Sequence, residues 1–360
     1  IFLTGATGFV GAYLLQGLLA TTDATVHCHV RAQTQKDGLA RLKKNLQFYK
    51  LWQDDFEGRI RAVFGFLTKP NLGFSKEVFT ELGNQVDVIY HNGALVNFAY
   101  PYQALKAANV YGTREVLRLA SLSKIKPVHF ISSISVLFDG DLQAGSTYSE
   151  DINLDELNVP FGGYGQSKWI SEKMLIEASQ RGIPITVFRP DNVSGDTTSG
   201  IWNADNMAHT LLKTAIVLQG VPDLEIKLGI VPVDFVRDAI LHLSVKPESF
   251  GKVFHLTSLE QVSFTKIIDM LTSYGFTLEK IPLNTWKEKI YQMAVQNPEE
   301  GYHAFYQLIE HLGTDSLSQV SMPRMDLTNT LAGIKGSHLK NPNMDIELLG
   351  KYIQYMDQEE

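Results

Sequence analysis

This chain of 360 residues has a single cysteine, no long apolar run and no excess of positive charge. Cys28 is the only cysteine, so no disulfide can form within the chain and nothing indicates secretion. No apolar run is long enough to span a membrane, and no signal-peptide pattern is present. The net charge of −7 argues against a nucleic-acid-binding protein. We therefore expect a cytoplasmic protein whose partners include neither nucleic acid nor membrane.

The ends and the length of the chain suggest how it is organised. The sequence has no initiator Met and begins inside what reads as a buried strand, so we expect a piece of a longer polypeptide. Its length allows one large domain or two.

The clearest functional signal lies at the N-terminus. Ile1–Thr4 reads as a buried strand, the glycines Gly5, Gly8 and Gly11 follow, and leucines at helical spacing come next. A strand, a glycine-rich turn and a helix in this order are typical of dinucleotide binding, because the backbone can approach the pyrophosphate and the helix N-terminus offers free N–H groups. The residues expected at this phosphate site are Gly5, Thr7, Gly8, Phe9, Val10 and Gly11.

The second expected strand, Thr25–Val30, ends at Arg31. About twenty residues after the last motif glycine, an acid would bind the ribose of NAD and a basic residue would accept the 2′-phosphate of NADP. Arg31 therefore favours NADP. Arg41, Lys43 and Lys44 would add positive charge nearby, although a solvated helix face is the favoured interpretation of these three residues.

Apolar runs alternate with helical patterns along the first 260 residues, which predicts an α/β fold of the Rossmann type with a doubly wound parallel sheet. The expected strands are Ile1–Thr4, Thr25–Val30, Arg61–Leu67, Val86–Tyr90, Pro127–Ser132, Ile185–Phe188 and Val253–Leu256. The expected helices are a helix after Gly11, Tyr102–Leu122, a helix from Tyr164 to about Gln180, Ala204–Leu218 and one within Val231–Leu243, with a helical insertion over residues 33–58.

The chain after Asp191 reads as a smaller, mostly helical lobe. Ser263 resembles an N-cap, Asn297–Glu300 a helix start and Gly313 a helix end, and a last helix is expected over Met344–Met356. We expect a Rossmann domain from residues 1–190 and about 225–258, and a substrate-binding subdomain from about 191–224 and 259–360.

Tyr164 and Lys168 stand one helical turn apart on the same face. A neighbouring cation lowers the pKa of a phenol, which makes it a usable proton donor or acceptor near neutrality. The same spacing recurs at Tyr102 and Lys106, so spacing alone does not identify the pair. Position does: the Tyr164 helix follows the strand that ends near Ser133 and leads into the next strand, whereas the Tyr102 pair is expected to pack.

Ser133 can hydrogen-bond the reacting oxygen from the neighbouring strand end. Ser132 and Ser135 are the nearest alternatives. His27 and His29 share a strand face but no third ligand is visible, so we expect no metal site.

Several strings together resemble the extended short-chain dehydrogenase/reductases. They are Thr4–Gly11, Arg31, His91–Ala94, Asn109–Thr113, Ser132–Ser133, Tyr164–Lys168 and Phe188–Pro190. Other strings are more similar to the thioester reductase domains that end nonribosomal peptide and polyketide synthases, and to the reductase domain of carboxylic acid reductases. These are His91–Asn97, Pro101–Tyr102, Gly163–Trp169 and Val233–Asp234.

The resemblance implies a catalytic set of Ser133, Tyr164 and Lys168. It implies NADPH as the cofactor and, as substrate, an acyl or peptidyl thioester on the phosphopantetheine arm of an upstream carrier protein, expected in the same polypeptide. The implied product is an aldehyde, which some members reduce again to an alcohol. Beyond the glycine turn and Arg31, the implied cofactor-binding residues are Arg41, Phe66, Leu67, Asn92, Gly93, Ala94, Asn109, Tyr164, Lys168, Pro190 and Val193.

The sequence departs from that family at two positions. Gly65-Phe66-Leu67 replaces the usual Gly-Asp-Leu, so adenine must be held by stacking or by backbone. Asp191 stands where glycine is common, near the expected nicotinamide end.

Other functions remain open on the same fold. One alternative is a sugar-nucleotide epimerase or dehydratase, or a ketone reductase; another is a nonenzymatic NADP-sensing protein. A thioesterase is disfavoured because no Gly-x-Ser-x-Gly string occurs.

Overall fold

The computed structural model of the chain describes residues 1–138, 146–204, 206–223, 227–296, 302, 306 and 323–359. The predicted helix start at Asn297–Glu300, the predicted helix end at Gly313 and the first part of the loop before Gly163 (139–145) lie outside these residues.

A parallel sheet of seven strands organises the larger lobe, in the order β12-β7-β5-β4-β1-β2-β3. The strands are β1 (Phe2–Thr4), β2 (Val26–Val30), β3 (Ile60–Phe64), β4 (Ile89–His91), β5 (Val128–Ile131), β7 (Ile185–Pro190) and β12 (Val253–Leu256). The chain order reverses between β1 and β4, and ligands of such sheets bind at the carboxyl ends of the strands beside this point. The predicted Rossmann-type fold is confirmed.

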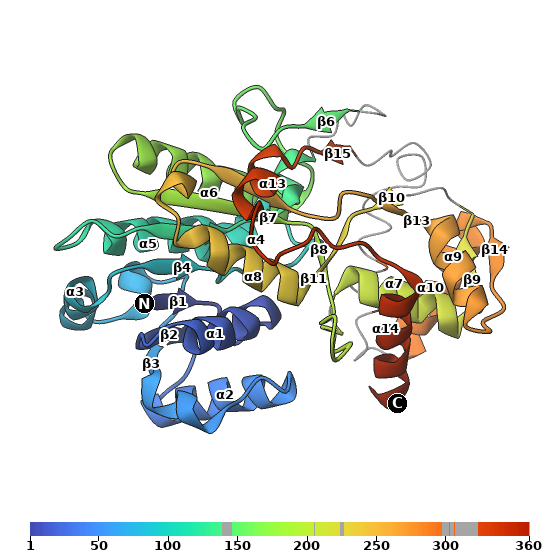
Figure 1. The fold of residues 1–360 in the computed structure, drawn as a ribbon, viewed down its shortest axis with the longest axis horizontal. Helices are drawn as coiled ribbons and strands as arrows, with labels where there is room; N and C mark the ends of the chain where they lie inside the picture. Colours follow the sequence, from blue (N-terminus) through green and yellow to red (C-terminus); the bar gives the residue numbers. More distant parts are fainter. Residues whose placement is uncertain are drawn as a thin grey trace.

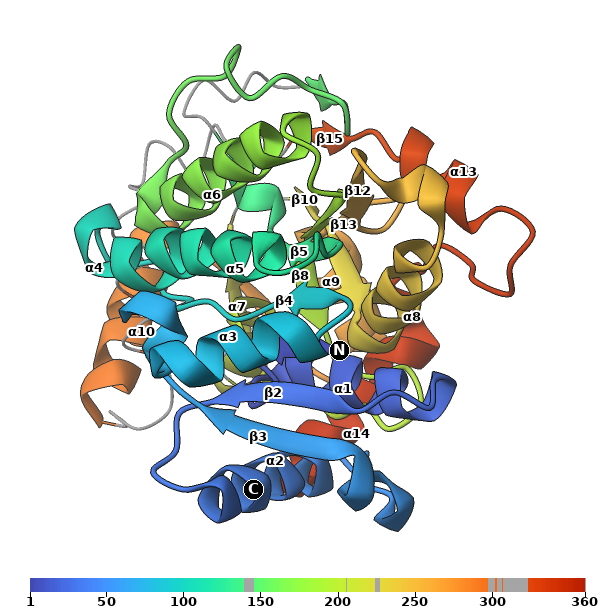
Figure 2. The same ribbon diagram turned by 90° about the vertical axis from the view of Figure 1, so that its left-hand side faces the viewer.

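Helices cover both faces of the sheet (Figure 2). One face carries α3 (Lys76–Gln85), α5 (Gly112–Ser121) and α6 (Gly162–Gln180), and the other carries α1 (Phe9–Thr21), α2 (Gln35–Phe48) and α8 (Val233–Ser244). Successive strand residues alternate between the two cores: Phe130 faces the first and Ile131 the second. Because both faces are buried, the strands read as continuous apolar runs.

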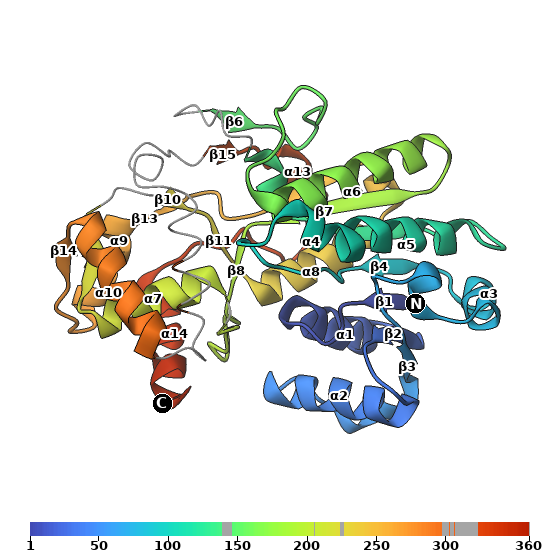
Figure 3. The same cartoon turned by 180° about the vertical axis from the view of Figure 1, so that it is seen from behind.

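A smaller lobe gathers at one side of the sheet (Figures 1 and 3). Its helices are α7 (Met207–Val217), α9 (Phe264–Ser273), α10 (Leu283–Gln296) and α14 (Ile346–Glu359). Three short strand pairs accompany these helices: β8 (Asn192–Ser194) with β11 (Ile230–Pro232), β9 (Gly220–Pro222) with β14 (Glu279–Ile281), and β10 (Lys227–Leu228) with β13 (Val262–Ser263). A fourth pair, β6 (Thr147–Tyr148) with β15 (Arg324–Met325), packs against Trp169 of α6 in the larger lobe. The helix α13 (Thr328–Ile334) packs on β12 and α8 instead. The proposed division into two domains remains a prediction.

The structure differs from the sequence prediction at several element ends. The third strand ends at Phe64 rather than Leu67, because Gly65 packs against the Leu72 carbonyl and the chain turns. The fourth strand begins at Ile89 rather than Val86, since Val86 ends the unpredicted helix α3 and donates its N–H to Leu82 O. The fifth and sixth strands run over Val128–Ile131 and Ile185–Pro190.

The helices differ in similar ways. The insertion at residues 33–58 contains α2 and a short 3-10 helix, Asp54–Arg59. The predicted helix Tyr102–Leu122 consists of α4 (Tyr102–Lys106), a π-helical turn (Ala107–Tyr111) and α5. Further 3-10 helices span Pro70–Gly73, Ile134–Leu137 and Pro247–Ser249.

Candidate active site

The turn between β1 and α1 can accept only glycine at two of its positions. Gly5 has φ of 76° and a Cβ there would lie 2.8 Å from Asn92 Nδ2. A Cβ on Gly11 would lie 1.9 Å from the Gly5 carbonyl oxygen. Gly8 is the N-cap of α1, and within the described part of the chain no side chain caps this helix end. The first-turn N–H groups, including that of Phe9, therefore point toward the space where an anion binds.

Two asparagines hold this turn in place. Asn92 Nδ2 donates to the Gly5 carbonyl at 3.4 Å. Asn45, which comes from α2 and was not predicted, donates to the carbonyls of Ala6 and Gly8 at 3.3 and 3.4 Å. The predicted residues Thr7 and Val10 are half-buried in the same turn. This cradle fits the pyrophosphate of a dinucleotide.

Two arginines meet at the carboxyl end of β2. Arg41 Nη1 donates to the Arg31 carbonyl oxygen at 3.0 Å, and both side chains are exposed. The structure thus brings Arg41 of α2 to the residue that follows β2. An exposed guanidinium group at this strand end suits a phosphate group.

Phe66 and Leu67 lie in the turn after β3. Phe66 is 49% exposed and donates its N–H to Leu72 O, so its ring is available for stacking. Leu67 lies against α5, where a Cβ on Gly112 would come within 3.3 Å of the Leu67 Cβ.

Tyr164 and Lys168 are buried on the face of α6 that covers β5. Lys168 Nζ donates to the Ile131 carbonyl oxygen at 2.7 Å and lies 4.6 Å from the centroid of the Phe130 ring. The ring of Phe98 contacts that of Tyr164, with centroids 5.1 Å apart. The phenol and the ammonium group are therefore each buried beside an aromatic ring, and the ammonium lies at the carboxyl end of β5.

Burial moves both pKa values toward the neutral forms. It lowers the pKa of Lys168 to about 7, an effect that the Glu172 carboxylate opposes, and it raises the pKa of Tyr164. We expected Lys168 to lower the phenol's pKa. The opposite direction has a structural cause: the lysine bonds to Ile131, and the phenol is surrounded by apolar groups such as Phe98.

Glycines let the first turn of α6 approach its neighbours closely. A Cβ on Gly163 would lie 2.4 Å from Tyr100 O and Tyr102 N, and one on Gly165 would lie 2.7 Å from Ser135 O. The start of α6 therefore rests directly on the 3-10 helix that follows Ser133. This contact brings Ser133 and Tyr164 to the same end of the sheet.

Hydrogen bonds distinguish Ser133 from its two neighbours. Ser132 Oγ donates to Glu172 Oε1, and Ser135 Oγ donates to Ser133 Oγ at 3.0 Å. Ser133 also accepts from the Ser135 N–H at 3.2 Å. Among the described residues Ser133 only accepts in these bonds, which leaves its own proton for a substrate oxygen as far as that part of the chain goes.

Asn109 lies in the π-helical turn at the centre of a buried network. Its side chain pairs with both the N–H and the carbonyl of Leu95, at 2.8 and 3.1 Å, and donates to Ser167 Oγ at 2.9 Å. Its carbonyl accepts from Thr113 Oγ1 and Ser171 Oγ at 2.6 and 3.0 Å. Asn109 therefore fixes α6 to the loop after β4.

His91 extends this network to the glycine turn. Its Nδ1 bonds Thr4 Oγ1 at 2.8 Å and its Nε2 bonds Thr113 Oγ1 at 3.0 Å, while Gly93 N–H donates to Thr4 Oγ1 at 2.8 Å. Burial, with a smaller contribution from Lys168, lowers the pKa of His91 to about 3. The imidazole is therefore neutral and structural. Ala94 follows in the same loop.

Asp191 now has a structural explanation. Its carboxylate accepts from Asn192 N–H at 2.8 Å and from Thr257 Oγ1 at 2.6 Å, which ties the end of β7 to the end of β12. A Cβ on Gly229 would lie 1.7 Å from Asp191 Oδ2, so the glycine there makes room for the carboxylate. Burial raises the pKa of Asp191 to about 6.

Pro190 ends β7 and Val193 lies on β8, where its carbonyl accepts from Trp202 Nε1 at 3.2 Å and Asn206 Nδ2 at 3.1 Å. Pro190 is thus the last residue of a sheet strand, and Val193 lies on the short strand that follows it.

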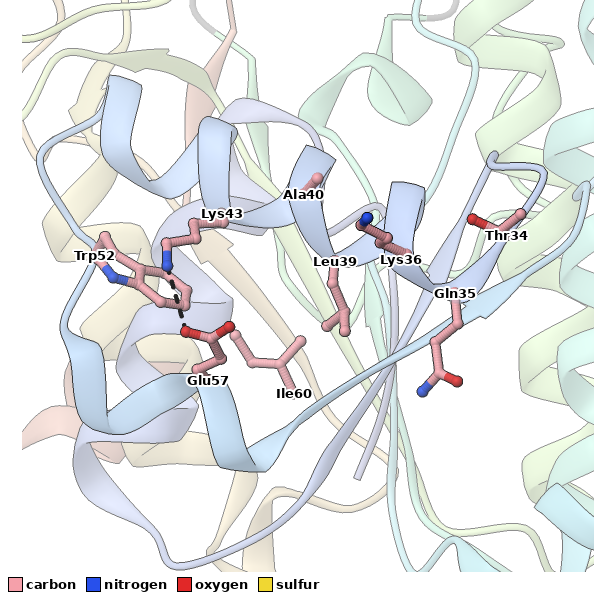
Figure 4. A pocket seen from close by; sticks show the side chains of 9 residues that line it. All are labelled: Thr34, Gln35, Lys36, Leu39, Ala40, Lys43, Trp52, Glu57 and Ile60. Carbon is pink, nitrogen blue, oxygen red and sulfur yellow. Dashed lines mark hydrogen bonds and ion pairs between the residues drawn. The ribbon is translucent and has the colours of Figure 1, made fainter.

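A surface hollow of about 650 Å³ lies elsewhere, between α2 and β3 (Figure 4). Its lining residues are Thr34, Gln35, Lys36, Leu39, Ala40, Lys43, Trp52, Glu57 and Ile60. In it Lys43 reaches Glu57 at 3.3 Å and lies over the Trp52 ring. None of the predicted site residues lines this hollow, and the ion pair of Lys43 with Glu57 joins its own walls.

Two features are absent over the described ranges. No group of three or more His, Cys, Asp or Glu side chains there is arranged to hold a metal ion. No helix among those residues is both long and apolar enough to cross a bilayer.

Comparisons with known proteins agree on one family. The family model described as male sterility protein, an NAD-binding domain, matches residues 3–240. The terminal R domain from the myxalamid PKS-NRPS biosynthetic pathway superposes with a TM-score of 0.91 at 37% identity, covering 99% of this chain and 90% of that one.

Two curated relatives are much longer than this chain. A linear gramicidin synthase of Brevibacillus parabrevis is 37% identical over 353 residues, which are 98% of this chain and 7% of that protein. The large subunit of L-2-aminoadipate reductase from Penicillium chrysogenum is 33% identical over 384 residues, which are 99% of this chain and 27% of that protein.

Proposed function

Because this chain belongs to the NAD-binding family described as male sterility protein, and within it to the terminal reductase domains, we propose that it reduces a carrier-bound acyl or peptidyl thioester to an aldehyde with NADPH. The observation that supports this proposal is that Lys168 bonds the Ile131 carbonyl at the carboxyl end of β5, directly before Ser132 and Ser133, and that Gly165, next to Tyr164, packs against the Ser135 carbonyl. The glycine turn follows β1, two strands away in the same sheet. The upstream carrier with its phosphopantetheine arm is part of the proposal.

The cofactor is proposed to bind along the carboxyl edge of the sheet. The glycine turn would hold the pyrophosphate, Arg31 and Arg41 the 2′-phosphate, and Lys168 the nicotinamide ribose. When bound, the reduced nicotinamide supplies the hydride that goes to the thioester carbon.

Residues of this chain supply the proton and stabilise the negative charge that develops on the substrate oxygen. Tyr164 donates its phenolic proton to the substrate oxygen, and the Ser133 hydroxyl donates a hydrogen bond to the same atom. The Lys168 ammonium stabilises the phenolate that remains. The resulting hemithioacetal then loses its thiol, and the aldehyde leaves.

An apolar rim on the loops near the start of α6 supports an acyl substrate. Large apolar side chains are exposed on the loops before α4 and α6, and Phe98 among them contacts the Tyr164 ring. The residues of this rim are Leu95, Val96, Phe98, Tyr100, Val159 and Phe161. Such a rim suits the chain of an acyl thioester and offers little to the charged phosphates of a sugar nucleotide.

Two features argue against the alternative of a sugar-nucleotide epimerase or dehydratase. Arg31 stands where enzymes that use NAD have an acid, and the rim is apolar. An enzyme of that alternative class would purify with bound NAD and would consume no external NADPH.

The direct test is turnover. Incubated with NADPH and a panel of acyl-pantetheine thioesters, the protein should consume NADPH and release free thiol together with aldehyde or alcohol, identified by mass spectrometry. No turnover with any thioester or with a loaded carrier protein would refute the proposed function.

The cofactor assignment has its own test. Arg31→Asp should lower the ratio of kcat/KM for NADPH over NADH by about tenfold or more, because one charge-assisted phosphate contact is replaced by repulsion. Lys44→Asp is a matched control on the same basic segment. An unchanged ratio in Arg31→Asp would show that Arg31 does not read the 2′-phosphate.

A further inference from the structure

A buried glutamate stands one helical turn beyond Lys168. Tyr164, Lys168 and Glu172 follow one another at intervals of four residues, so they share one face of α6. Glu172 is fully buried, and its partner Arg189, on β7, is 1% exposed. A charge at such a position needs partners on every side.

Arg189 and Ser132 satisfy this carboxylate completely. Arg189 Nε reaches both carboxylate oxygens at 3.1 Å, and its Nη2 reaches Oε2 at 2.7 Å. Ser132 Oγ donates to Oε1. The glutamate thus joins α6 to the ends of two strands, β5 and β7.

The strand end that it holds belongs to the site. Three consecutive residues lie at the carboxyl end of β5. The carbonyl of Ile131 accepts a hydrogen bond from Lys168, and Ser132 donates one to Glu172. Ser133 faces the reacting oxygen in the proposed mechanism. A shift of α6 along β5 would break both bonds together. The distance between Ser133 and Tyr164 therefore depends on Glu172.

A neutral histidine supports the arginine from behind. His255 Nδ1 lies 2.9 Å from the Asp326 carbonyl, so it carries the proton, and Nε2 accepts from Arg189 Nη1 at 3.2 Å. Burial, with Arg189 next, lowers the pKa of His255 to about 3, so this ring carries no charge. Arg189 cannot turn away from Glu172 without losing this bond.

The charged and titratable groups around Lys168 come from three elements. They are His91 on β4, Tyr164 and Glu172 on α6, and Arg189 on β7 behind Glu172. His91 is neutral and the phenol of Tyr164 is protonated, so Glu172 is the anion among them.

We propose that Glu172 is a positioning residue of the reduction site: through Ser132 and Arg189 it holds the end of β5 against α6, and its carboxylate is the counter-charge of the Lys168 ammonium. This role rests on the proposed function only for its effect on turnover. Its effect on Lys168 is a property of the protein alone.

The first measurement needs neither cofactor nor substrate. In protein labelled with ¹³C at lysine Cε, the Lys168 signal, assigned by its loss in Lys168→Met, should titrate near neutral pH. In Glu172→Gln the midpoint should fall by about one pH unit or more, because removal of a nearby opposite charge favours the neutral amine. An unchanged midpoint would overturn the counter-charge role.

A second variant tests whether a loss of activity in Glu172→Gln reflects only impaired folding. Glu172→Met combined with Arg189→Met replaces the ion pair by apolar groups of similar size, which proteins often tolerate well. If Glu172 only held the fold together, this double variant would keep its kcat. We expect it to fold, to show the lowered Lys168 midpoint, and to lose kcat by about tenfold or more, as removal of a general acid's support does.

Two further variants separate the two parts of the role. Ser132→Ala should lower kcat several-fold while leaving the Lys168 midpoint unchanged, since it weakens the attachment of β5 and keeps the charge. Glu115→Gln is the matched control: Glu115 is also buried and paired, with Arg114 and Arg118 on α5, away from Lys168. A shift of the Lys168 midpoint in this control as large as in Glu172→Gln would overturn the proposal.

The dependence of kcat/KM on pH is the last measurement. It distinguishes the positioning role of Glu172 from the proposed function. In Glu172→Gln the alkaline limb of kcat/KM should move to lower pH together with the Lys168 midpoint. If the wild-type protein reduces no thioester but Glu172→Gln still shifts the midpoint, the proposed function fails and the positioning role stands. If the wild type turns over and Glu172→Gln changes neither quantity, the positioning role fails alone.

Discussion

The chain contains the same spacing of tyrosine and lysine twice, on two helices that pack against each other. Tyr164 and Lys168 lie on α6 with both side chains buried, and Lys168 bonds the end of a sheet strand. Tyr102 and Lys106 lie on α4, where Lys106 is 5.9 Å from the Tyr102 ring and 5.2 Å from that of Tyr111. The two pairs differ in what surrounds them.

The surroundings act on the two lysines in opposite directions. Burial lowers the pKa of Lys168 to about 7, whereas the Tyr111 hydroxyl beside Lys106 raises the pKa of that ammonium. A tyrosine and a lysine at this spacing therefore do not by themselves indicate a catalytic role. Its place at the carboxyl end of a central strand supplies the chemistry.

The strongest test of this difference exchanges each phenol for a phenyl ring. Tyr164→Phe should lower kcat by about 10²- to 10⁴-fold, the usual range for loss of a general acid, while Tyr102→Phe should leave kcat within about twofold. Rates are measured with saturating NADPH and thioester. Equal losses in both variants would abolish the difference between the two pairs.

The lysines provide the next test. Lys168→Met should lower kcat/KM by about 10²-fold, since the phenolate loses its neighbouring cation. Lys106→Met should change it little because the rings that Lys106 contacts lie outside the proposed site. A loss on α4 comparable to that on α6 would show that Lys106 serves the reaction too.

The dependence of thermal stability on pH should distinguish Lys168→Met from Lys106→Met. The folded-state pKa of Lys168 lies near 7, below the value of about 10.4 in an unfolded chain. Between these values the unfolded chain binds more protons, so folding becomes more favourable as pH rises. The cost of burying this cation is complete below pH 7 and is relieved above it. The Tm of Lys168→Met relative to wild type should therefore be more favourable at pH 6 than at pH 9, and Lys106→Met should show no such trend.

The smallest expected effect comes from the glycine that lets α6 approach Ser135. Gly165→Ala places a Cβ 2.7 Å from the Ser135 carbonyl, so α6 must shift, at a cost of about 1–3 kcal/mol in unfolding free energy. We expect kcat to fall several-fold. Gly58→Ala is the control, because a Cβ there has no neighbour within 4 Å. Denaturant unfolding and initial rates measure both, and wild-type values in Gly165→Ala would contradict the close approach.

The parts of this site that depend on local pattern could be predicted from the sequence. Gly5 and Gly11 follow a strand and open a helix, and the structure requires glycine at both. Position along the chain also separated Tyr164 from Tyr102. Both inferences use only order and spacing, which the sequence contains directly.

Long-range contacts were not predicted because they have no local signature. Asn45 reaches the glycine turn from α2, and Glu172 finds Arg189 on another strand. Helix α3 was overlooked although Ser75 caps it, and the residue that ends it was assigned to the fourth strand. The direction of the Tyr164 pKa was wrong for the same reason: burial is a property of the fold.

The π-helical turn between α4 and α5 has a consequence for how this chain tolerates insertions and deletions. A wider turn of this kind accommodates one extra residue within a helix. Loss of one residue from it would restore a regular helix without turning α4 and α5 relative to each other, so only the residues of the turn itself, Asn109 among them, would change the direction in which they face. Asn109 would then face away from Leu95 and Ser167. A chain with this deletion would still align well with its relatives and would keep Ser133, Tyr164 and Lys168. It would nevertheless be disabled as an enzyme.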